Sequence, residues 1–268
     1  MKPLRRAADF AAGASHRIGR LFERFGEYAF LDARQASLGA VVPLDFEAAI
    51  RAYLSAGRDF SFIQIGAHEG DEGDPLSASI RAYGLRGVMV EPQPGPFATL
   101  QQNFADQSQL RFERVAIAPN DGSATFYSVD RAFWNRHGFP KGIDTQIASL
   151  NPAQIRFHVR LFGGAALAER EDEYLRSEEI PAMTLATLQA KHGIPRPSLL
   201  QIDTEGFDFE VIKMIDWANP PDMVHYETIH LGEADRIASW VLLRSKGYQL
   251  YATNSFNTLA IRAPDKGG

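Results

Sequence analysis

Glycines, carboxylates and histidines stand where short apolar runs of this chain end. The run at 60–65 leads into the loop Gly66–Gly70, which contains His68. A glycine turn has no Cβ, so its backbone N–H groups can approach a ligand closely. Glu91 ends the next apolar run, roughly 20–25 residues past the first glycine, where a carboxylate can accept hydrogen bonds from both hydroxyls of a ribose. The two features predict a nucleoside site; the alternative is an ordinary strand-to-helix turn followed by a surface acid.

The glycine spacing argues against a dinucleotide. Three residues separate Gly66 from Gly70, whereas a pyrophosphate site uses the pattern G-x-G-x-x-G at a helix N-terminus. Acidic side chains crowd the loop and its surroundings and would repel phosphate: Glu69, Asp71, Glu72 and Asp74. The loop therefore favours a cationic nucleoside without phosphates.

A second group of polar side chains follows two later apolar runs. Asp203 and Glu205 come after the first, and Glu227 and His230 come after the second. Because the carboxyl ends of parallel strands meet at one edge of a sheet, these side chains are expected near the ligand. Asp203, Glu205 and His230 are the candidates for a general base, which typically accelerates a reaction by about 10²–10⁴-fold. The alternative for His230 is a hydrogen-bonded structural histidine, and His225 lies inside its apolar run and is expected to be structural.

The same acids raise the question of a metal ion. The carboxylates of Asp203, Glu205 and Glu227 are hard oxygen ligands of the kind that Mg²⁺ prefers. Nothing in their spacing requires an ion, however, so no metal is expected.

Strands and helices are predicted to alternate along the chain. Apolar runs rich in Val, Ile and Leu predict strands, and segments with helical spacing lie between them, which favours a parallel sheet covered by helices on both faces. The predicted strands are 60–66, 86–92, 110–119, the start of 199–215 and 222–231, and the helices are 74–84, 96–106 and the end of 199–215. Two strand-like runs in 248–262 flank Asn254–Phe256 and predict a hairpin, which would make an antiparallel edge of the sheet.

One region interrupts the alternation. Residues near 122–182 are predicted to be an insertion, in which the acidic run 169–179 is expected to be a solvated helix face. Long irregular segments of compact domains are usually functional or disordered, and this one has too many aromatic residues for disorder. We therefore expect 130–182 to form a lid over the acceptor side; the alternative is an extra packing layer. Its aromatic residues include Phe133, Trp134, Phe139, Phe157 and Phe162.

Composition narrows the functional classes. The chain has 268 residues, of which 45% are hydrophobic and 23% charged, which is typical of a globular protein. A net charge of −5 argues against a nucleic-acid partner. There is no cysteine, which excludes disulfides and cysteine nucleophiles and is consistent with the reducing cytoplasm, where we expect the protein.

The N-terminal part, 1–55, is predicted to be a helical segment ahead of the main domain at 56–268. Ile18, Leu21, Phe22 and Phe25 recur at helical spacing among basic residues, which predicts a basic amphipathic helix. Such helices usually pack on their own domain or on a partner subunit, so contact with a membrane surface is the less favoured alternative. No apolar stretch approaches the roughly 18 residues that span a bilayer.

Several stretches, in this order, carry a family resemblance that covers roughly 60–262. The chain resembles the FkbM-type family of S-adenosylmethionine-dependent methyltransferases in FIQIGAHEGDEGDPL, YGLRGVMVEPQPGPFATL, RVAIAPNDGSATFY, MTLATLQAKHGI, LLQIDTEGFDFEVIKMIDW and HYETIHL. The resemblance implies a Rossmann-like class I methyltransferase fold, with a mostly parallel seven-stranded sheet whose last strand is antiparallel. This agrees with the hairpin predicted above. Where this family more usually has Gly-Ala-Asn, the loop here has Gly-Ala-His, so that His68 could replace the asparagine.

The resemblance also implies a cofactor site. The loop Gln64–Gly70 would hold the methionyl part of S-adenosylmethionine, Glu91 its ribose, and residues near Ala116 its adenine, while Asp203 would face the methionyl ammonium. The residues expected at the cofactor are Gln64, Gly66, Ala67, His68, Glu91, Pro92, Ala116 and Asp203.

We therefore expect an enzyme that transfers a methyl group from S-adenosylmethionine to a hydroxyl of a small-molecule or glycan acceptor. Asp203, Glu205 and His230 are the expected catalytic residues. One alternative is a nucleotide-linked oxidoreductase, which would use Glu91 in the same way but lacks its full glycine pattern here. The other is a non-catalytic module that binds S-adenosylmethionine, against which the acidic turn 203–206 argues.

Overall fold

The computed structural model describes residues 42–70, 74–137, 143–164, 167 and 169–262. The predicted basic amphipathic helix lies outside these residues. Of the N-terminal segment, the described part contains β1 (Val42–Pro43) and helix α3 (Phe46–Ser55), which begins where the side chain of Asp45 accepts a hydrogen bond from the N–H of Ala48. Among the described helices, none combines the length and the apolar character that crossing a membrane requires.

The main sheet confirms the expected α/β architecture. In the described residues it has eight strands in the order β1-β11-β12-β10-β9-β2-β3-β4, and all of them except β12 run in the same direction. Besides β1, the strands of this sheet are β2 (Ser61–Ile65), β3 (Arg86–Val90), β4 (Leu110–Glu113), β9 (Leu199–Ile202), β10 (Met223–Glu227), β11 (Tyr248–Ala252) and β12 (Asn257–Arg262). The chain proceeds outward from β2 in one direction and from β9 in the other. Ligands of such sheets bind at this switch point, beyond the carboxyl ends of the strands.

The C-terminal hairpin is present, but its place in the sheet differs from the expectation. Strand β12 lies between β10 and β11 and is antiparallel to both, so it is not an edge strand. After β10, helix α11 (Glu233–Ser245) leads to β11, which leaves room for one strand between β11 and β10. The hairpin then places β12 in that space. Strand β1 pairs with β11 and adds an eighth strand to the seven expected.

Helices cover both faces of the main sheet because its strands are apolar on both sides. In β2, Phe62 packs in one core with α3, α4 (Ser77–Tyr83) and α5 (Pro94–Asn103). The neighbouring Ile63 points to the opposite face and packs in a second core with α9 (Leu185–His192), α10 (Asp208–Lys213) and α11. The period-2 alternation of strand side chains thus gives each face of the sheet its own apolar core.

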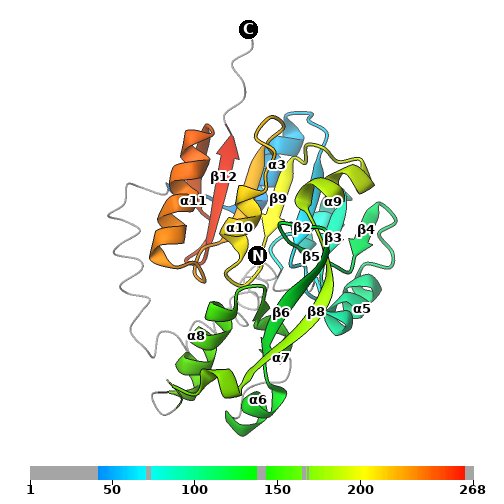
Figure 1. The fold of residues 1–268 in the computed structure, drawn as a ribbon. Helices are drawn as coiled ribbons and strands as arrows, with labels where there is room; N and C mark the ends of the chain where they lie inside the picture. Colours follow the sequence, from blue (N-terminus) through cyan, green and yellow to red (C-terminus); the bar gives the residue numbers. More distant parts are fainter. Residues whose placement is uncertain (1–41, 71–73, 138–142, 165–166, 168, 263–268) are drawn as a thin grey trace, which may run out of the picture.

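The inserted region forms a second sheet. Its order is β5-β8-β6-β7, from β5 (Ala116–Ile117), β6 (Gly122–Val129), β7 (Ala148–Ser149) and β8 (Leu175–Met183). Figure 1 shows the long β6–β8 pair in the same half of the view as α6 (Arg131–His137), α7 (Ile143–Gln146) and α8 (Pro152–Gly163). The strand predicted at 110–119 is therefore two strands, because the chain leaves the main sheet after Glu113 and enters the second sheet at Ala116.

The predicted helix in the acidic run 169–179 is wrong. The run forms a short 3₁₀ turn (Glu171–Glu173) and then enters β8, which pairs with β6 from Leu175 to Ala182. Cross-strand pairing over this length outweighs the local preference of acidic residues for a helix.

Candidate active site

The glycine loop after β2 lies against the residue that follows β9. Gly66 has a φ of +80°, and a Cβ at this position would lie 1.6 Å from the carbonyl oxygen of Asp203. The N–H of Gly66 donates to the carbonyl of Val90, and the N–H of Asp203 donates to the carbonyl of Ile65. The glycine is therefore required by a close approach of two backbones, and this approach brings the predicted cofactor loop next to Asp203.

Glu91 is buried at the end of β3, with 3% of its surface exposed. Its Oε2 accepts a hydrogen bond of 3.0 Å from the N–H of His68, and its Oε1 accepts one of 2.8 Å from the N–H of Gln93. Burial raises the pKa of the Glu91 carboxyl to about 7, although the two backbone donors oppose the shift. A carboxylate has about four lone-pair positions, so the two backbone donors do not use the full hydrogen-bonding capacity of Glu91.

The insertion reaches the same loop. The Nε2 of His68 lies 3.1 Å from the hydroxyl oxygen of Thr145 in α7, and the side-chain amide of Gln93 donates to the carbonyl of Thr145 at 2.7 Å. His68 itself has a positive φ of +46°. The histidine that replaces the more usual asparagine thus connects the loop to the insertion.

The other expected cofactor residues lie in different surroundings. Ala67 is buried beside Gly66, and Pro92 is partly buried next to Glu91. Gln64 is buried within the face of the sheet, in register with Met89 and Gln201, and its Oε1 has no hydrogen-bond partner within the described part of the chain. Ala116 is buried in the second sheet with Phe126, Ala148 and Ile180.

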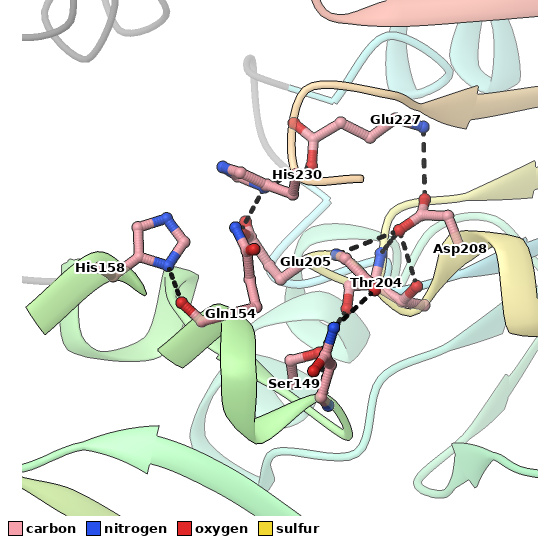
Figure 2. Close-up of polar contacts among 10 residues, drawn as sticks. Ser149, Gln154, His158, Thr204, Glu205, Asp208, Glu227 and His230 are labelled. Carbon is pink, nitrogen blue, oxygen red and sulfur yellow. Dashed lines mark hydrogen bonds and ion pairs between the residues drawn. The ribbon is translucent and has the colours of Figure 1, made fainter. Parts of the chain in front are cut away.

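Three side chains of the predicted acceptor side converge. The Nδ1 atom of His230 lies 2.8 Å from Oε2 of Glu205 and 2.8 Å from Oε2 of Glu227 (Figure 2). All three atoms are buried, and in the described part of the chain none of them has a contact with hydrogen-bond geometry. Burial opposes a charge on His230, but the two carboxylates outweigh it and raise the pKa of the imidazole well above its usual value.

Asp203 lies beside this cluster on its solvent side. Its side chain is exposed, yet protein surrounds it closely enough that loss of water, together with the negative charges of Glu227 and Glu205, raises the pKa of its carboxyl group. Carboxylate oxygens of Asp203, Glu205 and Glu227 all lie within 4.8 Å of one another. The structure therefore brings together the three predicted catalytic residues.

A buried acid that we did not predict holds the turn in place. Asp208, which is fully buried, accepts hydrogen bonds at Oδ2 from the hydroxyl of Thr204 at 2.9 Å and from the N–H groups of Thr204 and Gly206. Its Oδ1 accepts one from the N–H of Glu227 at 3.3 Å. The sequence signal was an aspartate at the first position of a predicted helix, where backbone N–H groups are free to be bound.

Helix α8 and the strand before it complete the site from the insertion. The hydroxyl of Ser149 donates to the carbonyl of Thr204 at 3.0 Å, and the side-chain amide of Asn151 donates to the carbonyl of Gly206 at 3.2 Å. On α8, the His158 ring lies 5.0 Å from the His230 ring, centroid to centroid. No pattern in the sequence indicated His158, because its role depends on how α8 packs against the main domain.

The aromatic residues of the predicted lid pack mainly on one another. Phe133 and Trp134 are buried in a core of the insertion's own, with Val129, Ile155 and Val159. Phe162 stacks on the ring of His158, and Phe139 lies outside the described residues. The contacts between insertion and strand ends are instead made by the polar side chains described above.

Comparison with known proteins gives one family. The family model of the methyltransferase FkbM domain matches residues 64–250. Solved structures with low similarity include the methyltransferase FkbM from Methylobacillus flagellatus KT, with 14% identity and a TM-score of 0.42 over 77% of this chain and 45% of that one. Another is the precorrin-6y C5,15-methyltransferase from Geobacter metallireducens GS-15, with 10% identity and a TM-score of 0.38 over 84% of this chain and 99% of that one.

A third solved structure is an RNA methyltransferase from Salinibacter ruber in complex with S-adenosyl-L-homocysteine, with 10% identity and a TM-score of 0.35 over 84% of this chain and 98% of that one. The present chain spans less than half the length of the Methylobacillus protein. Its sequence has no significant match among curated proteins.

Proposed function

The chain belongs to the FkbM methyltransferase family, and from this premise we propose that it transfers a methyl group from S-adenosylmethionine to a hydroxyl of a small-molecule or glycan acceptor. The observation that carries the proposal is the buried carboxylate of Glu91, which accepts the His68 N–H of the glycine loop at the switch point of the sheet. The net charge of −5 supports an acceptor other than nucleic acid, and the lack of cysteine is consistent with a cytoplasmic enzyme.

The cofactor would lie across the ends of β2, β3 and β9. Glu91 would accept hydrogen bonds from the ribose hydroxyls, while the Gly66 loop and Asp203 would face the methionyl end. When bound, S-adenosylmethionine supplies a methyl group already activated by the sulfonium. The residues of the chain then have to align an acceptor oxygen behind that methyl group and remove the proton of the hydroxyl.

The acceptor would enter beside Asp203. Asp203 adjoins the cofactor loop, and Glu205 and His230, which are mostly buried, belong to the same group of side chains, so we assign the three to orienting the acceptor and taking its proton. The insertion forms the other wall of this entrance, as a lid. The hydrogen bonds from Ser149 and Asn151 to the 204–206 turn support this assignment.

The first test is the affinity for S-adenosylmethionine. Removing a hydrogen bond to a charged group costs roughly 1.5–3 kcal/mol, so Glu91→Ala and Glu91→Gln should each weaken binding by about tenfold or more. Isothermal titration calorimetry with S-adenosylmethionine measures this, and Glu178→Gln, which changes an exposed acid of β8, is the matched control. Circular dichroism checks that each variant is folded. Unchanged affinity in folded Glu91 variants, or binding of NAD in place of S-adenosylmethionine, would contradict the proposal.

Cofactor affinity should also depend on pH. The ribose hydroxyls donate to an ionised carboxylate, but the pKa of Glu91 is raised to about 7 in the free protein, so below that pH binding must also remove a proton. Affinity should therefore increase between pH 6 and pH 8, by up to about tenfold per pH unit at the acidic end, with protons released on binding.

Calorimetry in two buffers of different ionisation enthalpy measures the released protons. The amino group of the cofactor also titrates near this range, so the quantity of interest is the difference between the parental protein and Glu91→Gln. The variant should release fewer protons and have a flatter profile. Identical profiles would show that Glu91 does not ionise on binding.

A further inference from the structure

Two carboxylate oxygens flank one buried imidazole nitrogen, and hydrogen bonding does not account for both contacts. Nδ1 of His230 is 2.8 Å from a carboxylate oxygen of Glu205 and equally far from one of Glu227, and neither contact has hydrogen-bond geometry. A protonated Nδ1 carries a single N–H, which points in one direction in the plane of the ring and can satisfy at most one good acceptor. One proton therefore does not account for both contacts.

The distances are those expected of ligands that share an ion. Nitrogen and oxygen ligands of divalent metals lie about 2.1 Å from the ion, so two ligands at right angles around it are about 3 Å apart. The separations of 2.8 Å from His230 to each acid are close to this value. A bound cation would also compensate the negative charge of these carboxylates in place of a proton on His230.

His158 provides an independent indication. It is 99% buried, since only 1% of its surface is exposed, and its Nδ1 lies 3.0 Å from the carbonyl of Gln154. A hydrogen bond to a carbonyl places the proton on Nδ1 and leaves the lone pair on Nε2, which is the arrangement typical of metal-binding histidines.

The free nitrogen of His158 belongs to the same cluster. Its Nε2 has no hydrogen-bond partner among the residues that the structure describes. Ligand atoms of His158, Glu205 and His230 lie within 4.8 Å of one another, and Figure 2 shows the His158 ring on the side of α8 that faces the other two. The buried imidazole of His158 thus offers a ligand atom close to those of Glu205 and His230.

We propose that His158, Glu205 and His230, with Glu227 beside them, bind a divalent transition-metal ion. Imidazole nitrogen combined with carboxylate oxygen suits Mn²⁺, Fe²⁺ or Zn²⁺ better than Mg²⁺ or Ca²⁺, which prefer oxygen ligands alone. From the sequence we expected no metal, because that expectation was based on the spacing of the three acids alone. The proposal also takes the two histidines into account.

The role of the ion rests on the proposed function. Asp203 lies on the exposed side of the cluster, where an acceptor hydroxyl could reach the ion. An oxygen bound to a divalent cation has a lowered pKa, so its proton is more easily lost at neutral pH. With Glu205 and His230 bound to the ion, Asp203 is the one of the three residues assigned to the acceptor's proton that is left to receive it. The favoured acceptors are those whose hydroxyl group can act as a metal ligand.

The experiment uses the full chain after treatment with a chelator. Calorimetric titrations with MnCl₂, ZnCl₂ and MgCl₂ should show one site, with Mn²⁺ or Zn²⁺ bound more tightly than Mg²⁺. His158→Asn, Glu205→Gln and His230→Asn should each weaken binding by at least about tenfold. His192→Asn is the matched control, because this histidine contacts Glu113 and lies outside the cluster. Absence of binding to the folded parental chain, or equal affinity in all variants, would overturn the proposal.

A second measurement needs no variant. Pulsed electron paramagnetic resonance of bound Mn²⁺ detects nitrogen nuclei of coordinating imidazoles, which we expect to observe in the parental protein. A spectrum without nitrogen coupling would overturn the ligand assignment. The cofactor titration separates the two proposals, because metal binding without S-adenosylmethionine binding supports the ion site and contradicts the proposed function. Binding of S-adenosylmethionine without metal binding supports the proposed function and contradicts the ion site.

Discussion

Gly66→Ala should abolish or nearly abolish stable folding. The φ of +80° at this position costs a residue with a side chain about 1–2 kcal/mol. Steric overlap costs more, since the new Cβ would lie 1.6 Å from the carbonyl oxygen of Asp203. Backbone hydrogen bonds tie Gly66 to Val90 and Asp203 to Ile65, so neither strand end can move away without breaking the sheet. A cost above about 5 kcal/mol is comparable to the whole stability of many domains.

Urea denaturation followed by circular dichroism measures this effect, and Gly84→Ala is the matched control. Gly84 also has a positive φ, of +60°, but nothing lies within 4 Å of the position that its Cβ would take. It should lose only about 1 kcal/mol, which is the conformational cost alone. Equal losses in the two variants would show that the contact between Gly66 and Asp203 is not as close as described.

Asp208→Ala should be the second strongly destabilising change. The carboxylate is fully buried and binds the hydroxyl of Thr204 and three backbone N–H groups, of Thr204, Gly206 and Glu227. Alanine would leave those donors without an acceptor in a site from which water is largely excluded. A buried donor left unsatisfied costs about 1–3 kcal/mol, so a total loss of about 3 kcal/mol or more is expected.

The control for Asp208 is Asp216→Ala. Asp216 also accepts hydrogen bonds from a backbone N–H and a side chain, those of Ala218 and Asn219, but it is exposed and water can replace it. Its loss should cost less than about 1 kcal/mol. The melting temperatures of the two variants provide the comparison. If the two variants had the same melting temperature, the buried carboxylate of Asp208 would not stabilise the 204–206 turn.

Much of the main domain follows from local sequence. Strands β2, β3, β9 and β10 are read directly from short apolar runs, because a strand buried on both faces needs apolar side chains at nearly every position. The glycine loop and Glu91 could be placed together for a similar reason, since a parallel sheet brings the carboxyl ends of its strands to one edge whatever the details of packing. The same argument placed Asp203, Glu205 and His230 near one another.

Only the tertiary structure decided the features that depend on packing between distant segments. The run 110–119 divides between two sheets, and part of the acidic run lies in β8. In both cases pairing with a neighbouring strand outweighs the secondary-structure propensity of the segment. Asp208 and His158 contact groups that are remote in sequence: Asp208 accepts a hydrogen bond from the N–H of Glu227, and the His158 ring lies against that of His230. Spacing predicts which edge a residue occupies, but the direction of its side chain and the partner it meets are set only when the helices and the insertion pack.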